Sequence, residues 1–335
     1  MSHYFLGIDT GATKSHALIA DESGRALGFG VGGSGNPDAV GHDGLAVVLR
    51  SIVHQALAAA GISAGQLAGA GFGIAGYDWP SQRGSILQTL QAALELGQTP
   101  VELVNDALIG LLAGAAEGWG VAVVAGTSCN CWGWDQQRRV GRMTGYSHLF
   151  GEAAGGYELA AKAIHAVAAE WTRRGPATRL TPALIEWAGA QGLEDLLEGL
   201  SQGRYRLSAA AAPVVFRVAA AGDPVAVDLV RWAGRELGGM ALGVIRQLGF
   251  EGLTFDVVLA GSFYNGSPLI AETMAETIHT VASHARLLRL TVPPVVGGVL
   301  LGMEQTGLDP LPVRERLIQS TDELLARGGT ADEHG

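Results

Sequence analysis

The sequence predicts an α/β protein built from two lobes of related design. Strand-like apolar runs alternate with helix-like stretches along most of its 335 residues. A strand, a Gly-Thr turn and a second strand open the chain and recur about 115 residues later. Hydrophobic residues make up 48% of the chain and charged residues only 16%, so a large core can form and disorder is not expected.

The first lobe is predicted over residues 1–118 and opens with a β-meander. Apolar runs at 4–8, 15–20 and 25–31 are separated by a glycine turn and a polar turn, as in consecutive short strands. The rest of the lobe is predicted to contain, in order, a helix at 43–60, a strand at 70–75, a helix at 81–96, a strand at 101–104 and a helix at 107–117.

The second lobe is predicted over residues 119–311 and repeats the opening of the first. Strands at 120–125 and 132–134 flank the second Gly-Thr turn. Residues 155–250 are rich in Ala, Leu and Glu and read as a mostly helical insertion interrupted by prolines. The remaining predicted elements are strands at 255–259 and 287–292, a helix at 297–305 and a terminal helix at 312–327, which we expect to pack back on the first lobe.

Composition excludes several classes of function. The net charge of -10 and the pI near 5.3 argue against nucleic acid as a partner. The two cysteines, Cys129 and Cys131, are one residue apart, so a disulfide between them would be badly strained. The N-terminus does not read as a signal peptide, and no uninterrupted run of eighteen apolar residues occurs. We therefore expect a cytoplasmic protein with no membrane partner.

The segment Gly7-Ile8-Asp9-Thr10-Gly11-Ala12-Thr13-Lys14-Ser15 has the composition of a phosphate cradle. A tight turn with consecutive backbone N–H groups, hydroxyls and a lysine suits phosphate, and Asp9 beside it suits Mg²⁺ held through water. It is not a P-loop, because the required Gly-Lys-Ser/Thr is missing. An ordinary hairpin turn is the alternative, and the second such turn at Gly126-Thr127 favours the cradle, because two turns can grip one polyphosphate.

Asn105-Asp106 directly follows a predicted buried strand and precedes a predicted helix, so Asp106 stands just beyond the strand. A carboxylate there projects from the end of an α/β sheet and can take the proton of an attacking hydroxyl in phosphoryl transfer. A helix N-cap is the alternative, and spacing alone does not separate the two. In Cys129-Asn130-Cys131 two thiolates make a poor zinc site, whereas the Asn130 amide suits a sugar hydroxyl.

Five motifs in their order resemble those of the acetate-kinase, sugar-kinase, Hsp70 and actin superfamily, over residues 4–305. Within it, the chain is similar to the BadF/BadG/BcrA/BcrD ATPase branch, which includes N-acetylglucosamine kinases. The motifs are the first phosphate segment at 7–15, Val104-Asn105-Asp106-Ala107, Gly126-Thr127-Ser128-Cys129-Asn130-Cys131, Leu259-Ala260-Gly261-Ser262 and Pro294-Val295-Val296-Gly297-Gly298. A sugar-contacting asparagine of the kinases corresponds to Asn36.

The resemblance implies two ribonuclease-H-like, actin-like ATPase lobes with ATP and Mg²⁺ in a cleft between them, and a homodimer. It implies an amino-sugar kinase that acts on the 6-hydroxyl of N-acetylglucosamine, with Asp106 as the catalytic base. The implied ATP contacts are Asp9, which is also the implied metal ligand, Gly11, Thr13, Lys14, Gly126, Thr127, Gly261 and Ser262. The implied sugar contacts are Asn36, Asp106, Cys129, Asn130, Gly145, Tyr146, Ser147 and Glu152.

Two segments depart from the family pattern. Glu152 stands where an aspartate normally binds the sugar, Ala153 replaces the next acidic residue, and Tyr146 replaces a tryptophan. Ser128-Cys129 replaces Gly-Ser in a turn that usually needs the conformational freedom of glycine. These departures bear on which sugar is bound more than on the chemistry.

Two alternatives remain open from the sequence. Glucosamine is the second candidate substrate. An ATPase switch that regulates a protein partner is the second candidate class, since the branch also holds reductase activators that share an iron–sulfur cluster across a dimer. Such a cluster needs two well-separated cysteines per subunit, which Cys129 and Cys131 do not supply.

Overall fold

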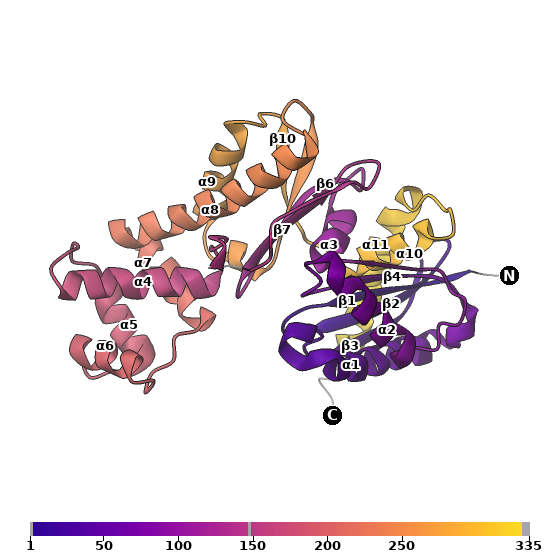
Figure 1. Ribbon diagram of the computed structural model, residues 1–335, viewed down its shortest axis with the longest axis horizontal. Helices are drawn as coiled ribbons and strands as arrows, with labels where there is room; N and C mark the ends of the chain where they lie inside the picture. Colours follow the sequence, from indigo (N-terminus) through magenta and orange to yellow (C-terminus); the bar gives the residue numbers. More distant parts are fainter. Residues whose placement is uncertain (1–2, 147–148, 330–335) are drawn as a thin grey trace. The chain divides into compact units, whose positions relative to one another are not determined.

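The protein is described by a computed structural model covering residues 3–146 and 149–329. Its strands are β1 (Tyr4–Thr10), β2 (Ser15–Asp21), β3 (Ala26–Gly32), β4 (Leu67–Ile74), β5 (Val101–Val104), β6 (Gly120–Ala125), β7 (Cys129–Trp134), β8 (Val140–Arg142), β9 (Phe255–Ala260) and β10 (Ala285–Arg289). They form two five-stranded sheets, β3-β2-β1-β4-β5 and β10-β9-β6-β7-β8 (Figure 1). The predicted α/β class with two sheets is therefore confirmed.

Helices account for most of the remaining chain. They are α1 (Pro37–Ala60), α2 (Arg83–Ala93), α3 (Asp106–Gly114), α4 (Gly156–Trp171), α5 (Leu180–Ala188), α6 (Leu193–Ser201), α7 (Ala212–Ala220), α8 (Pro224–Leu248), α9 (Pro268–His279), α10 (Val295–Glu304) and α11 (Leu311–Gly329). Short 3₁₀ turns lie at Ala64–Gln66, Pro80–Gln82, Ala209–Ala211 and Ser262–Asn265.

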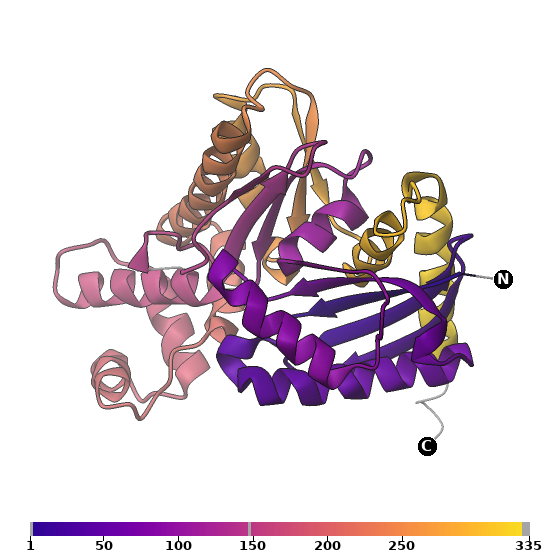
Figure 2. The same cartoon turned by 45° about the vertical axis from the view of Figure 1, so that its right-hand side comes forward.

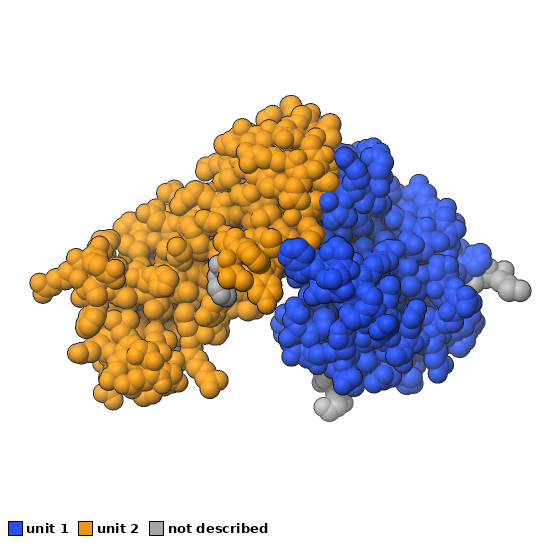
Figure 3. Space-filling view, in the orientation of Figure 1, with its two compact units in different colours: residues 1–122, 132–140, 288–335 blue, residues 123–131, 141–287 orange. Residues whose placement is uncertain are grey.

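Contacts divide the chain into two compact units, which Figure 3 colours separately. Unit 1 comprises the chain up to residue 122, residues 132–140 and the chain from residue 288. Unit 2 comprises residues 123–131 and 141–287. Each unit holds one set of the residues that the sequence singles out, so each is described by itself.

The sheet of unit 1 is antiparallel on one side of β1 and parallel on the other. β1 pairs antiparallel with β2, and β2 with β3, whereas β1, β4 and β5 run parallel. This is the strand order expected of a ribonuclease-H-like sheet. Because parallel strands end at the same edge, the residues that follow β1, β4 and β5 lie together there.

Helices cover both faces of this sheet (Figures 1 and 2). On one face α1 approaches β3 so closely that a Cβ at Gly30 would stand 2.0 Å from the Ile52 carbonyl oxygen. On the other face α10 lies on β1 and β4, and a Cβ at Gly71 would stand 2.2 Å from the Gly298 oxygen. Only glycine permits this backbone approach, which explains part of the high glycine content.

The helix predicted from residue 43 is the part of α1 that follows a kink at Gly41, where φ is 68° and ψ is 175°. A short helical segment that begins at Pro37 precedes the kink. Asn36 caps it by accepting a hydrogen bond from the Asp38 N–H, and proline suits the first helical position. By length and composition alone, α1 is also long and apolar enough to cross a membrane. In the fold its buried side chains, among them Leu45, Leu49 and Ile52, join the core formed on the sheet.

The C-terminal helix α11 is joined to the β2–β3 turn. The Ser320 hydroxyl donates to the Gly24 carbonyl oxygen at 2.9 Å and accepts from the Ala26 N–H at 2.9 Å. The Arg314 guanidinium also donates to the Ala113 oxygen at the end of α3. These hydrogen bonds link the end of the described chain to its beginning within unit 1.

Candidate active site

Three carboxylates gather at the edge of unit 1 where the parallel strands end. Asp9 lies near the end of β1, Asp78 lies in the loop after β4, and Asp106 is the first residue of α3, two positions after the end of β5. The negative charges of Asp9 and Asp78 both act on Asp106. Sequence reasoning singled out Asp9 and Asp106 but missed Asp78. It too stands shortly after a buried strand, which is the pattern that singled out Asp106.

The structure separates the two roles considered for Asp106, because its neighbour Asn105 is the N-cap of α3. The Asn105 side-chain oxygen accepts from the Ala107 N–H at 3.0 Å. Its amide nitrogen donates to the Tyr77 carbonyl oxygen at 3.1 Å and to Asp78 Oδ1 at 3.2 Å. Asn105 is 1% exposed, so it joins the start of α3 firmly to the loop after β4.

The surroundings of Asp106 favour its protonated form. Burial raises the pKa of Asp106 to about 7, and the negative charges of Asp9 and Asp78 add to that rise. The residue as a whole is half-buried, at the start of α3. A carboxylate with a pKa near neutrality is suited to take a proton during catalysis.

The first Gly-Thr turn forms an exposed hairpin between β1 and β2. The Gly11 N–H donates to the Lys14 oxygen at 2.9 Å, and Ala12, Thr13 and Lys14 are exposed. At its base the Thr10 and Ser15 hydroxyls are buried, and neither has a hydrogen-bond partner within the described residues. The turn thus presents a hydroxyl, an ammonium group and a short backbone loop to solvent, which is what a phosphate cradle requires.

Asn36 lies next to this hairpin in unit 1. The preceding residue, Gly35, donates its N–H to the Gly11 oxygen at 3.1 Å. A Cβ at Gly76, after β4, would stand 2.4 Å from Asn36 Oδ1. Unit 1 therefore brings together Asp9, Gly11, Thr13, Lys14, Asn36 and Asp106, all predicted from the sequence.

The second Gly-Thr turn lies in unit 2 and is supported by the start of α4. The Gly126 N–H donates to the Ser128 oxygen at 2.8 Å, which makes the turn tight. The Gly156 and Tyr157 N–H groups donate to the Gly126 and Thr127 oxygens at 2.8 and 3.0 Å. Thr127 is exposed at the tip.

The predicted adenosine motif is a neighbour of this turn. Gly261 has φ 101°, a conformation that favours glycine, and a Cβ there would stand 2.2 Å from the Ala125 oxygen. Gly261 and Ser262 are both exposed. Within unit 2 the end of β9 and the turn after β6 therefore form one continuous edge.

The predicted sugar contacts of unit 2 follow the same turn. Asn130 is half-buried on β7, and its side-chain oxygen accepts from the Cys131 N–H at 2.8 Å. Cys129 is buried, and burial raises the pKa of its thiol to about 12. Its sulfur is bonded internally, accepting from the Ala154 N–H at 3.3 Å and donating to the Glu152 oxygen at 3.6 Å. The Cys129 side chain therefore presents no free polar group.

The segment that follows β8 carries the other predicted sugar contacts. Gly145 and Tyr146 lie there, and Tyr146 is exposed. Glu152 is buried, and both of its carboxylate oxygens accept backbone hydrogen bonds from Thr144 and Gly145. Ser147, also a predicted sugar contact, lies outside the described residues.

The described residues can support a nucleotide-bound magnesium ion but not a closed metal cage. Within residues 3–146 and 149–329, no group of three or more His, Cys, Asp or Glu side chains could hold a metal ion. Mg²⁺ in nucleotide sites is commonly held by one or two carboxylates together with phosphate oxygens and water. Asp9, beside the exposed hairpin, fits that arrangement.

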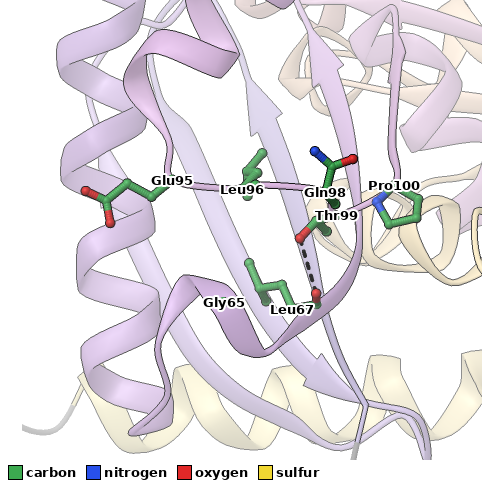
Figure 4. Close-up of a pocket in the computed structure, with 8 residues that line it drawn as sticks. Gly65, Leu67, Glu95, Leu96, Gln98, Thr99 and Pro100 are labelled. Atoms are coloured by element: carbon green, nitrogen blue, oxygen red, sulfur yellow. Dashed lines mark hydrogen bonds between the residues drawn. The ribbon is translucent and has the colours of Figure 1, made fainter.

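A shallow pocket of about 330 Å³ lies elsewhere in unit 1, as Figure 4 shows. Its lining comes from Gly65, Leu67 and residues 95–100, and the Thr99 hydroxyl donates to the Leu67 oxygen at 3.2 Å. These residues precede or begin β4 and β5, so the pocket lies at the edge opposite to the three carboxylates. It holds none of the residues predicted for the site.

Comparison with known proteins places the chain among kinases and ATPases. The profile of the BadF/BadG/BcrA/BcrD ATPase family matches residues 6–302. An N-acetylmuramic acid/N-acetylglucosamine kinase of Clostridium acetobutylicum is 23% identical over 304 residues, covering 90% of this chain and 99% of that protein. An N-acetyl-D-glucosamine kinase of Dictyostelium discoideum is 24% identical over 315 residues, covering 89% and 97%.

A solved structure shows the same fold. It is a candidate N-acetylglucosamine kinase from Chromobacterium violaceum, which superimposes with a TM-score of 0.68 at 21% identity. The match covers 89% of this chain and 98% of that one.

Proposed function

The chain belongs to the BadF/BadG/BcrA/BcrD ATPase family, and within it we propose an ATP-dependent kinase that phosphorylates the 6-hydroxyl of an amino sugar. N-acetylglucosamine is the proposed substrate, because both curated relatives are named as kinases of this sugar. The observation that carries the proposal is Asp106, a carboxylate with a pKa raised to about 7 beside an exposed Gly-Thr hairpin of the same unit. Glucosamine is the second candidate substrate.

In the proposed reaction Asp106 acts as the general base. It accepts the proton of the sugar 6-hydroxyl as that oxygen attacks the γ-phosphorus of ATP. The new P–O bond forms at the sugar, the bond to the β-phosphate oxygen breaks, and ADP leaves. Asn105 keeps Asp106 in place, since it ties the start of α3 to Tyr77 and Asp78.

The two hairpins are the proposed phosphate contacts. Thr13 and Lys14 of unit 1 and Thr127 of unit 2 would bind phosphate oxygens, with Gly11 and Gly126 allowing close backbone approach. Gly261 and Ser262 would flank the adenosine. Asp9 would orient Mg²⁺, which neutralises charge on the phosphates.

The proposed sugar contacts are Asn36 of unit 1 and Asn130, Gly145 and Tyr146 of unit 2. An amide side chain offers both a donor and an acceptor, which suits a sugar hydroxyl. We also propose a cytoplasmic homodimer. The homodimer rests on the family resemblance alone.

The test is release of ADP from Mg²⁺-ATP, measured with a panel of sugars. The panel contains N-acetylglucosamine, glucosamine, N-acetylmannosamine, N-acetylmuramic acid and glucose. Strong stimulation by N-acetylglucosamine is the expected result. A slow ATPase that no sugar stimulates would overturn the kinase proposal and favour a switch that acts on a protein partner.

A further inference from the structure

Glu152 lies between β8 and α4 in unit 2, and each of its two carboxylate oxygens accepts a hydrogen bond from the backbone. Oε1 accepts from the Thr144 N–H at 2.7 Å and Oε2 accepts from the Gly145 N–H at 2.9 Å. The residue is 4% exposed. Hydrogen bonds from N–H groups to a carboxylate are among the stronger ones, and here each oxygen holds one of two consecutive donors.

The backbone around Glu152 is itself anchored to β7. The Glu152 carbonyl oxygen accepts from the Cys129 thiol at 3.6 Å, and the Ala154 N–H donates to the same sulfur at 3.3 Å. The loop that Glu152 holds is anchored to β7 as well, because the Met143 N–H donates to the Cys131 oxygen at 2.9 Å. Residues 143–145 are therefore held by hydrogen bonds to β7 on one side and to the Glu152 carboxylate on the other.

The held segment determines where Tyr146 lies. Gly145 has φ 76°, a backbone conformation that residues other than glycine rarely adopt. Its N–H donates a hydrogen bond to the Glu152 carboxylate. Tyr146 follows at once, is 61% exposed and makes an edge-to-face contact with Phe150, with ring centroids 6.1 Å apart. The two hydrogen bonds to Glu152 therefore support this turn, together with the one that the Tyr146 N–H donates to the Thr144 hydroxyl at 3.4 Å.

We propose that Glu152 is a positioning residue of the sugar site: its carboxylate fixes the Thr144–Tyr146 loop and does not itself bind the sugar. This inference rests on the proposed function and deepens it, because it assigns sugar recognition on this segment to the loop. The chain has glutamate where the resemblance implies a sugar-binding aspartate. In this chain the longer glutamate side chain carries the carboxylate to both N–H groups.

Two variants test the assignment kinetically. Glu152→Gln keeps the size but offers one acceptor and one donor group, so one N–H loses its partner. Glu152→Asp keeps the charge but is shorter by one C–C bond, about 1.5 Å. Both variants are expected to raise the KM for the sugar about tenfold. The KM for ATP and kcat should stay within about threefold, since neither the base nor the hairpins change.

The matched control is Glu170→Gln. The Glu170 carboxylate also accepts two hydrogen bonds within unit 2, from the Thr178 N–H and the Thr181 hydroxyl, but it belongs to the helical insertion. This control should leave the KM for the sugar unchanged. Thermal unfolding of all three variants shows that they are folded.

Amide hydrogen exchange without any sugar tests the contact itself. In the wild type, the Thr144 and Gly145 amides should be protected, and in both Glu152 variants that protection should be lost. Unchanged protection in the variants, or a KM for the sugar that stays the same, would overturn the proposal. A lower KM for the sugar in Glu152→Asp would also overturn it, because it would show that the carboxylate at position 152 binds the sugar directly.

The same experiments distinguish a failure of the proposed role of Glu152 from a failure of the proposed kinase activity. If the wild type phosphorylated no sugar, the proposed function would fail, and the positioning of a sugar site would fail with it. The exchange data would then still show whether Glu152 holds the loop. If the wild type were active and the variants unaffected, only the role of Glu152 would fall.

Discussion

At the scale of single residues, the chemistry depends on Asp106. Replacement by asparagine keeps the shape but removes the base, so kcat is expected to fall by about 10²–10⁴-fold. The dissociation constant for Mg²⁺-ATP should stay near the wild-type value, because the hairpin residues are unchanged. Steady-state kinetics and calorimetric titration measure the two quantities. A variant that kept most of its kcat would show that Asp106 is not the base.

The same substitution should stabilise the folded protein at alkaline pH. The pKa of Asp106 is raised from 3.8 to about 7 on folding, so the folded state binds a proton that the unfolded state has released. Stability is therefore lost as pH rises through this range. Asparagine does not titrate, so Asp106→Asn avoids this loss of stability. The free energy of unfolding of the variant relative to the wild type should therefore increase by about 1–2 kcal/mol between pH 5.5 and pH 8.

Thermal unfolding of the wild type and Asp106→Asn at both pH values measures this difference. A gain in Tm of a few degrees at pH 8, larger than that at pH 5.5, is the expected result. An equal effect at the two pH values would show that Asp106 has an ordinary pKa.

Asp78, in the loop after β4, affects the pKa of the proposed base Asp106. Its negative charge contributes to the raised pKa of Asp106, and its Oδ1 accepts from Asn105. Asp78→Asn keeps an acceptor oxygen but removes the charge. The pKa of Asp106 should fall, and the acidic limb of the kcat/KM profile should move to lower pH. The exposed Asp228→Asn on α8 is the control and should leave the profile in place.

At the scale of elements, the loop before α1 is seated on the first hairpin. A Cβ at Gly35 would stand 2.7 Å from Ser15 Oγ and 2.8 Å from Thr10 Cβ, closer than real contacts allow. Gly35→Ala should therefore displace both Asn36 and the hairpin, and raise the KM for the sugar and for ATP together. A Cβ at Gly33 would meet nothing within 4 Å.

Gly33→Ala is accordingly the matched control for Gly35→Ala, and its kinetics should resemble those of the wild type. A change in only one KM for Gly35→Ala would mean that the hairpin and the Asn36 loop are independent. Equal effects from both substitutions would mean that loop flexibility, not the contact, is responsible.

At the scale of the whole molecule, local sequence patterns predicted most helices and strands but not the long-range hydrogen bonds that join them. The two Gly-Thr turns, the strand before Asp106 and the helical insertion were all visible as short-range periodicity and turn residues. The bonds from Asn105 to Asp78 and from Glu152 to Thr144 were not, because a hydrogen bond to a distant backbone or side chain leaves no periodic pattern. The short helical segment from Pro37 to the kink at Gly41 has no apolar periodicity of its own, and only its Asn36 cap and Pro37 mark it in the sequence.

The proposed transfer of phosphate to the 6-hydroxyl of the sugar involves residues of both units, so the product of the reaction is the test of the proposed kinase activity. Wild-type protein, Mg²⁺-ATP and N-acetylglucosamine should yield ADP and N-acetylglucosamine 6-phosphate in equal amounts, with the phosphate position read from ¹H–³¹P correlation spectra. The same mixture with Asp106→Asn should yield almost none. Free phosphate released without a phosphorylated sugar, or a phosphate on another hydroxyl, would contradict the account.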